Sequence, residues 1–111
     1  MSVDTLSTRD RELLSEVKAA ILELEPSAEI ILYGSRARGD AGPESDWDLV
    51  VLVDGIVDHR RDERVNHRLY EICLERDAVI TAFLHGKDEW NTPVYRAMPF
   101  RQNVVREGVR L

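Results

Sequence analysis

The feature that most constrains this sequence is the run Asp48-Leu49-Val50-Val51-Leu52-Val53, in which five consecutive aliphatic residues follow an acidic one. Aliphatic runs rich in valine favour extended structure, so this run predicts a β-strand. A second apolar run covers residues 28–33 and stops at Gly34-Ser35, and a third covers residues 77–84. The three runs predict the strands of a small sheet.

Helical periodicity surrounds these strands. Residues 6–25 place leucine, isoleucine and valine mostly at three- and four-residue spacings, and Pro26 ends the pattern. Residues 58–76 present a similar apolar face. Pro99 suits the first turn of a last helix, which we expect to end at Gly108.

The order helix, strand, strand, helix, strand, helix predicts an α/β fold, with a small mixed β-sheet of three to four strands packed with helices. The 111 residues fit a single domain covering residues 1–111. A chain of this size can build one core but no large enclosed active site. A second copy or a partner chain can therefore complete a pocket, and we expect a homo- or hetero-oligomer to be possible.

The net charge and the hydropathy of the chain argue against two classes of partner, nucleic acids and membranes. The formal net charge is −6, and no basic block is present. This argues against direct binding of nucleic acid, which normally needs a clustered positive surface. No run approaches the roughly 20 apolar residues of a membrane span, and the first residues do not read as a signal peptide. We therefore expect no membrane association and a cytoplasmic location.

Residues that can bind a ligand or take part in catalysis are concentrated between Gly34 and Asp48. Gly34-Ser35 lies where a predicted strand enters a short helix, so backbone N–H groups can face a phosphate there. Gly34 lets the phosphate approach because it has no Cβ, and the Ser35 hydroxyl can add a hydrogen bond. Arg36 follows directly and can pair with a phosphate oxygen.

Two acidic residues complete this segment. Asp46 and Asp48 are two positions apart, so in extended structure their side chains share a face, while Trp47 points to the opposite face. Neighbouring carboxylates repel unless a cation lies between them, and such ligands suit Mg²⁺ together with the phosphates of a substrate. The segment thus predicts a nucleoside triphosphate and metal site, with phosphoryl or nucleotidyl transfer as its chemistry.

The run Gly34-Ser35-Arg36-Ala37-Arg38-Gly39, followed by Ser45-Asp46-Trp47-Asp48-Leu49-Val50-Val51, resembles the signature of the DNA polymerase beta-like nucleotidyltransferases. It is most similar to the minimal nucleotidyltransferases of that superfamily. The resemblance implies the nucleotidyltransferase (polymerase beta palm-like) fold, ATP as substrate and Mg²⁺ as cofactor. It also implies that Gly34 and Ser35 contact the triphosphate and that Asp46 and Asp48 bind the metals.

The same resemblance suggests a biological role. Many minimal nucleotidyltransferases are antitoxins beside an all-helical HEPN-domain toxin, which they neutralise by transferring AMP from ATP onto a toxin tyrosine. We therefore expect a protein adenylyltransferase whose partner is a HEPN toxin. A small hydroxylated molecule is an alternative acceptor, as in antibiotic-modifying relatives, although those are normally longer.

The family pattern includes a third carboxylate on a neighbouring strand. By strand alternation Asp77, Val79 and Thr81 share a face, and the more central Thr81 has no carboxylate. Asp77 is therefore the predicted third catalytic acid, with Glu75 and Glu44 as weaker substitutes. If Asp77 is out of reach, the chain is instead a catalytically weak nucleotide- and metal-binding antitoxin that neutralises its partner by direct binding.

Overall fold

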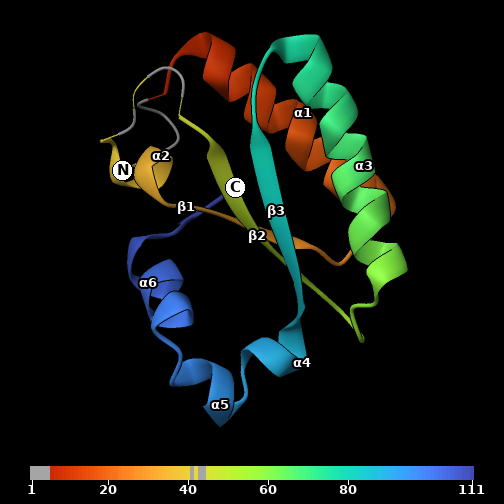
Figure 1. The fold of residues 1–111 in the computed structure, drawn as a ribbon, viewed down its shortest axis with the longest axis vertical. Helices are drawn as coiled ribbons and strands as arrows, with labels where there is room; N and C mark the ends of the chain where they lie inside the picture. The colour runs from red at the N-terminus through yellow and green to blue at the C-terminus, as the bar shows by residue number, and fades with distance from the viewer. Residues whose placement is uncertain (1–5, 41, 43–44) are drawn as a thin grey trace.

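The computed structural model describes residues 6–40, 42 and 45–111 (Figure 1). The helices and strands of the described chain are, in order, α1 (Thr8–Leu24), β1 (Glu29–Tyr33), α2 (Ser35–Arg38), β2 (Trp47–Val53), α3 (His59–Arg76), β3 (Ile80–Gly86), α4 (Lys87–Trp90), α5 (Pro93–Arg96), α6 (Pro99–Glu107) and β4 (Val109–Arg110). None of these helices combines the length and the hydropathy that a membrane span requires.

The strands form one mixed sheet in the order β3-β2-β1-β4. β1 pairs antiparallel with both β2 and β4, whereas β2 and β3 are parallel. The connection from β2 to β3 runs through α3, as parallel neighbours require a crossover. The predicted mixed sheet packed with helices is confirmed.

Helices cover the two faces of the sheet unequally. α1 and α3 lie against one face, and the short helices α4, α5 and α6 gather near part of the other (Figure 1). Residues of β2 alternate between two cores, as expected for a strand. Leu49 and Val51 join the larger core with α1 and α3, whereas Val50 and Leu52 join a smaller cluster with Trp90 of α4.

Most predicted elements appear within a few residues of the expected bounds. The N-terminus of α1 is capped by Ser7, whose hydroxyl oxygen accepts a hydrogen bond from the Asp10 amide at 3.1 Å. The start of the third strand was predicted wrongly, because β3 begins at Ile80 and not at residue 77. Asp77 instead ends α3 in the left-handed conformation, with φ of 51°.

Two elements were not predicted from the sequence. α5 (Pro93–Arg96) is a single turn capped by Thr92, and β4 (Val109–Arg110) is a two-residue strand. β4 forms by pairing with Ile31 and Leu32 of β1. Elements this short depend on tertiary contacts, which local sequence patterns do not encode.

Candidate active site

Asp48 lies at the centre of the candidate site. It is the second residue of β2 and pairs in register with Tyr33 of β1 and with Thr81 of β3. Because paired residues of neighbouring strands point to the same face, these two side chains flank Asp48. Trp47 points the other way and is buried in the core with α1 and α3, as predicted.

Gly34 brings the backbone against the Asp48 carboxylate. It follows β1 and precedes α2, with φ of 78° and ψ of −159°, a conformation that is essentially restricted to glycine. A Cβ at this position would lie 2.8 Å from Asp48 Oδ2. Glycine is therefore required here both by the backbone conformation and by the close approach of a carboxylate. The structure thus brings the glycine turn and the second aspartate together.

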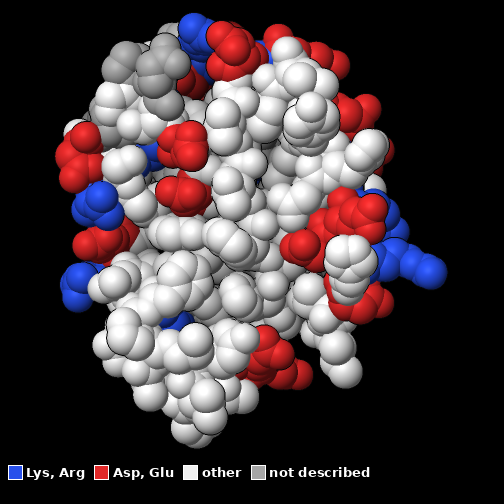
Figure 2. Space-filling view, in the orientation of Figure 1, with Lys and Arg blue, Asp and Glu red and all other residues white. Residues whose placement is uncertain are grey.

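Asp46 shares this environment, one residue before β2 begins. Burial raises the pKa of the Asp48 carboxyl above its ordinary value, and the charge of Asp46 raises it further. Figure 2 shows acidic groups side by side over the start of β2. Such a pair is electrostatically unfavourable by itself, so a divalent cation between the carboxylates would relieve the repulsion.

Ser35 begins the four-residue helix α2. Its carbonyl oxygen accepts hydrogen bonds from the amides of Gly39 and Asp40, which closes the helix, and Gly39 ends it in the left-handed conformation. The side chain of Ser35 is half-buried beside the glycine turn. α2 therefore holds Ser35 next to Gly34, where the predicted phosphate contact would be made.

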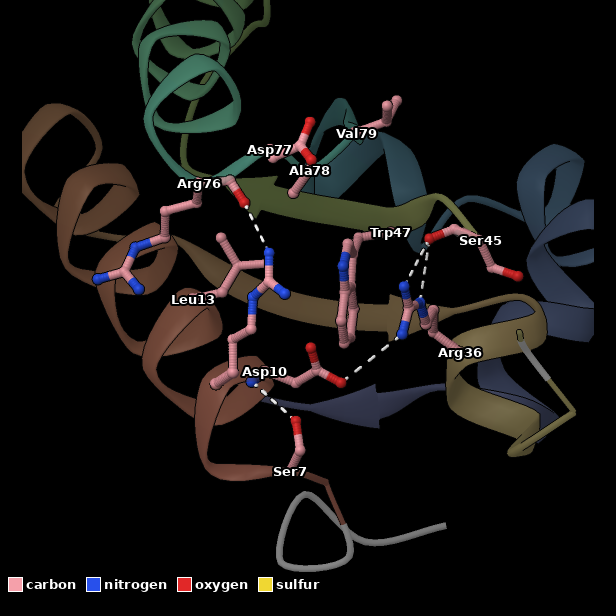
Figure 3. A pocket seen from close by; sticks show the side chains of 11 residues that line it. Ser7, Asp10, Leu13, Arg36, Ser45, Trp47, Arg76, Asp77, Ala78 and Val79 are labelled. Atoms are coloured by element: carbon pink, nitrogen blue, oxygen red, sulfur yellow. Dashed lines mark hydrogen bonds and ion pairs between the residues drawn. The ribbon is translucent and has the colours of Figure 1, made fainter. Parts of the chain in front are cut away.

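Arg36 fixes the segment that leads into the two aspartates (Figure 3). Its Nε and Nη2 atoms donate hydrogen bonds to the Ser45 carbonyl at 3.1 and 2.8 Å. The guanidinium lies 4.1 Å from the centre of the Trp47 ring, and its Nη1 atom lies 3.7 Å from Asp10 Oδ2. These contacts place the Arg36 guanidinium on the Trp47 side of the sheet. A contact between Arg36 and a phosphate remains a prediction.

The structure does not bring Asp77 beside Asp48. Asp77 lines a pocket of about 400 Å³ together with Leu13 of α1 and the Trp47 side chain (Figure 3). Trp47 and Asp48 point to opposite faces of the sheet, because they are consecutive residues of β2. Thr81, not Asp77, is the β3 residue in register with Asp48.

Two weaker substitutes for a third acid were predicted, Glu75 and Glu44. Glu75 is exposed on α3, and Glu44 lies outside the described residues. Within residues 6–40, 42 and 45–111, no group of three or more histidine, cysteine, aspartate or glutamate side chains is arranged to hold a metal ion. Among the described residues, Asp46 and Asp48 are therefore not joined by a third acidic, histidine or cysteine ligand.

The nucleotidyltransferase domain model matches residues 14–91, which is most of the chain and includes Gly34, Asp46 and Asp48. The chain belongs to the nucleotidyltransferase domain family. The fold and the family predicted from the sequence are thereby confirmed.

Individual relatives agree with this assignment. The nucleotidyltransferase is 33% identical over 79 residues to "Putative protein adenylyltransferase MJ0604" of Methanocaldococcus jannaschii, covering 71% of this chain and 72% of the relative. A crystal structure described as a "putative nucleotidyltransferase" has a TM-score of 0.62 and 25% identity, and the match covers 88% of this chain and 96% of the other. A crystal structure of a toxin–antitoxin with AMP-PNP shares the fold, with a TM-score of 0.59 and 20% identity, over 86% of this chain and 69% of the other.

Sequence reasoning did not identify the aromatic surroundings of the site in this nucleotidyltransferase. Tyr33 flanks Asp48, and burial and the charge of Asp48 raise the pKa of the Tyr33 hydroxyl. The Tyr33 ring packs edge-on against Phe100 of α6, with 5.5 Å between ring centres. A tyrosine directly before the Gly-Ser turn was the available signal, but its contact with α6 is set by packing between residues far apart in the sequence.

Proposed function

We propose that this nucleotidyltransferase transfers AMP from ATP to a hydroxyl group of a partner protein, and that it acts in this way as an antitoxin. The observation that carries the proposal is the close approach of the Asp48 carboxylate to the Gly34 backbone, with Asp46 adjacent. A phosphate held at the glycine turn would lie next to two carboxylates, which is the arrangement that metal-assisted nucleotidyl transfer requires.

In this proposal Gly34 and Ser35 bind phosphate oxygens, while Asp46 and Asp48 are the protein ligands of Mg²⁺. Mg²⁺ would supply charge neutralisation between the carboxylates and the phosphates. The acceptor oxygen forms a bond to the α-phosphorus, the bond from that phosphorus to the pyrophosphate oxygen breaks, and the hydroxyl proton passes to solvent. The role of the protein is to position the two reactants and to stabilise charge.

Two comparisons support a protein acceptor and a toxin partner. The Methanocaldococcus jannaschii relative is named as a protein adenylyltransferase, and a toxin–antitoxin crystallised with an ATP analogue has the same fold. We propose a HEPN-domain toxin as the partner, on the basis of the family resemblance, and the cytoplasm as the place where the two proteins meet.

A second function is favoured by one observation. Thr81 is in register with Asp48, and Asp77 lies on the pocket beside Trp47. A site with two carboxylates can bind nucleotide and metal and still transfer AMP slowly. In that case the chain would neutralise its partner by direct binding.

Isothermal titration calorimetry with ATP tests the site. We expect Mg²⁺-dependent binding by the wild type, and Asp48→Asn should weaken this binding at least about tenfold, because a direct ligand is lost. Asp88→Asn, which changes an exposed acid on α4, should leave the binding unchanged. Equal binding by all three proteins, or binding that is independent of Mg²⁺, would refute the proposed site.

Incubation with a HEPN-domain toxin and ATP labelled at the α-phosphate separates the two functions. Label on a toxin tyrosine that disappears with Asp48→Asn supports transfer. Full neutralisation by a double Asp46→Asn, Asp48→Asn variant, with no label on the toxin, supports neutralisation by direct binding.

A further inference from the structure

The sheet face that carries Asp48 is only partly covered by helices. Trp90 of α4 and Val104 of α6 bury the middle of this face, where Val50 has no exposed surface. Two large aromatic side chains at the margin stay accessible, with Phe83 of β3 46% exposed and Phe100 of α6 36% exposed. Exposed aromatic groups next to a catalytic site are typical anchors of a protein–protein contact.

These aromatic groups are close to the site. Phe83 is two residues after Thr81 on β3, so both side chains lie on the face that carries Asp48. Phe100 packs against Tyr33, which is the β1 partner of Asp48. We call Tyr33, Phe83 and Phe100 the apolar shelf. It begins directly beside the carboxylate at which transfer is proposed to occur.

Acidic groups lie at both ends of the apolar shelf. The two aspartates of the site are at one end. At the other end, Glu89 of α4 accepts a hydrogen bond from the Tyr95 hydroxyl at 2.6 Å. The Tyr95 ring lies 5.7 Å from the ring of His85, which is two residues after Phe83. Figure 2 shows acidic groups on several sides of a wide uncharged area over β3 and α6, together with basic groups at the margin beside α6. The shelf is therefore an apolar surface with acidic groups at both ends.

Two cations on the neighbouring helices are engaged in contacts within the chain. Lys87 of α4 lies 3.3 Å from Asp54, and Arg101 of α6 donates a hydrogen bond to the Trp90 carbonyl at 2.7 Å. These contacts direct both cations to groups of their own chain. Charge complementarity therefore favours a ligand that is apolar in the middle and basic at its ends.

We propose that the apolar shelf docks a basic segment of the acceptor protein, whose apolar side chains flank the hydroxyl that receives AMP. The inference rests on the proposed function and adds the chemistry of the acceptor. The aromatic rings of the shelf anchor the apolar side chains of the segment, and the acidic ends attract its lysines and arginines. The segment thereby aligns its hydroxyl with the Asp48 end of the shelf.

Two fluorescein-labelled peptides test this docking by fluorescence anisotropy in the absence of nucleotide. Each contains one tyrosine between two leucines, flanked by lysines in one peptide and by glutamates in the other. We expect the lysine peptide to bind the wild type and the glutamate peptide not to bind. Phe83→Ser should weaken binding of the lysine peptide at least about tenfold, as loss of an aromatic anchor does. Phe83→Lys should weaken it by more, because it also adds a like charge.

Leu74→Ser is the matched control, since Leu74 is an exposed apolar residue of α3, 67% exposed. It should leave the affinity for the lysine peptide unchanged. The docking proposal is overturned if the lysine peptide fails to bind the wild type, if the glutamate peptide binds equally well, or if the Phe83 variants bind as tightly as the control.

Loss of peptide docking can be distinguished from loss of the nucleotide site. Peptide binding is measured without ATP, whereas Mg²⁺-dependent ATP binding is measured on the same proteins by calorimetry. Loss of peptide binding with ATP binding retained would be a failure of docking alone. Circular dichroism of each variant shows whether the fold is retained, and Phe83→Lys gives a second reading if Phe83→Ser unfolds.

Discussion

At the scale of single residues, the candidate site depends on how closely Gly34 approaches Asp48. The backbone conformation of Gly34 is costly for any residue with a side chain, and the nearest atom to an added Cβ is a carboxylate oxygen. The same glycine therefore determines both the turn and the distance between the turn and the acid.

Gly34→Ala should lower the free energy of unfolding by roughly 2 kcal/mol, the cost of a strained backbone conformation together with a displaced carboxylate. It should also weaken Mg²⁺-dependent ATP binding, because Asp48 must move. Urea denaturation and calorimetry measure the two effects. Gly42→Ala is the control, since no atom of the described residues lies within 4 Å of an added Cβ there, and it should change neither quantity. Equal effects of both changes would contradict this account.

Thr81 is the β3 neighbour of Asp48 and is therefore the position at which a third acid can be added. Thr81→Asp adds a third carboxylate and should tighten Mg²⁺ binding roughly tenfold, as affinity follows the number of charged ligands. Without metal, the same variant should be less stable than the wild type, because the carboxylates repel. Thr81→Asn, which adds no charge, should show neither change. Calorimetry measures the affinity for Mg²⁺, and urea denaturation with and without Mg²⁺ measures stability. Weaker Mg²⁺ binding or higher metal-free stability of Thr81→Asp would contradict this prediction.

At the scale of elements, the short helix α2 and the segment leading into β2 are held together by one side chain. Four residues are too few for a helix to be stable by itself, so α2 depends on contacts outside it. Arg36 provides these contacts through the Ser45 carbonyl and the Trp47 ring. The position of Asp46, directly after Ser45, follows from this contact.

Arg36→Lys should lower the free energy of unfolding by about 1–2 kcal/mol, because lysine cannot make the paired hydrogen bonds or stack as a planar group. ATP binding should weaken as well, since the segment that carries Asp46 loses its anchor. Arg38→Lys is the matched control in the same helix. Arg38 is exposed and pairs with Asp40 and Glu107, so this change should leave both measurements near the wild type. Unchanged ATP binding in Arg36→Lys would argue against the positioning role.

At the scale of the whole molecule, an ion pair joins Glu25, the residue that caps the C-terminus of α1, to Arg61 of α3. The Glu25 carboxylate is 5% exposed, and its oxygens accept hydrogen bonds from Arg61 at 2.7 and 3.1 Å. Arg61 also donates to the carbonyls of Ile56 and Asp54, in the connection between β2 and α3. The hydrogen bonds from Arg61 hold the pKa of the Glu25 carboxyl below its ordinary value of 4.5, although burial alone would raise it.

This shift predicts how stability depends on pH. Because the pKa of Glu25 is lowered by folding, the pair stabilises the protein fully above the unfolded-state pKa, and the contribution is lost as pH falls through the folded-state pKa. Glu25→Gln should therefore cost roughly 2 kcal/mol at pH 7, less than a fully buried pair would, since Arg61 stays partly hydrated. The difference between wild type and variant should shrink as the pH falls below about 4.5.

Urea denaturation between pH 7 and pH 3 measures this difference. Glu23→Gln changes an exposed acid in the last turn of α1, two residues before Glu25, and should leave the curve unchanged. A difference between wild type and Glu25→Gln that stays constant over the whole range would show that the charge of Glu25 is not involved.

Local patterns determined much of this protein. The aliphatic run of β2, the periodicity of α1 and α3 and the turn at Gly34-Ser35 each encode their structure within a few residues, so the types of these elements were predictable. The alternation that sends Trp47 into the core and Asp48 to the other face is equally local.

Tertiary structure alone decided which residues stand beside Asp48. The neighbour on β3 is Thr81, because the register of two parallel strands is set by packing across the crossover helix α3. The contacts of Arg36, the pairing of β4 and the incomplete cover that leaves the apolar shelf exposed also depend on groups far apart in the chain. A sequence pattern reports the conformation of its own segment, whereas these neighbours are selected by the free energy of the whole fold.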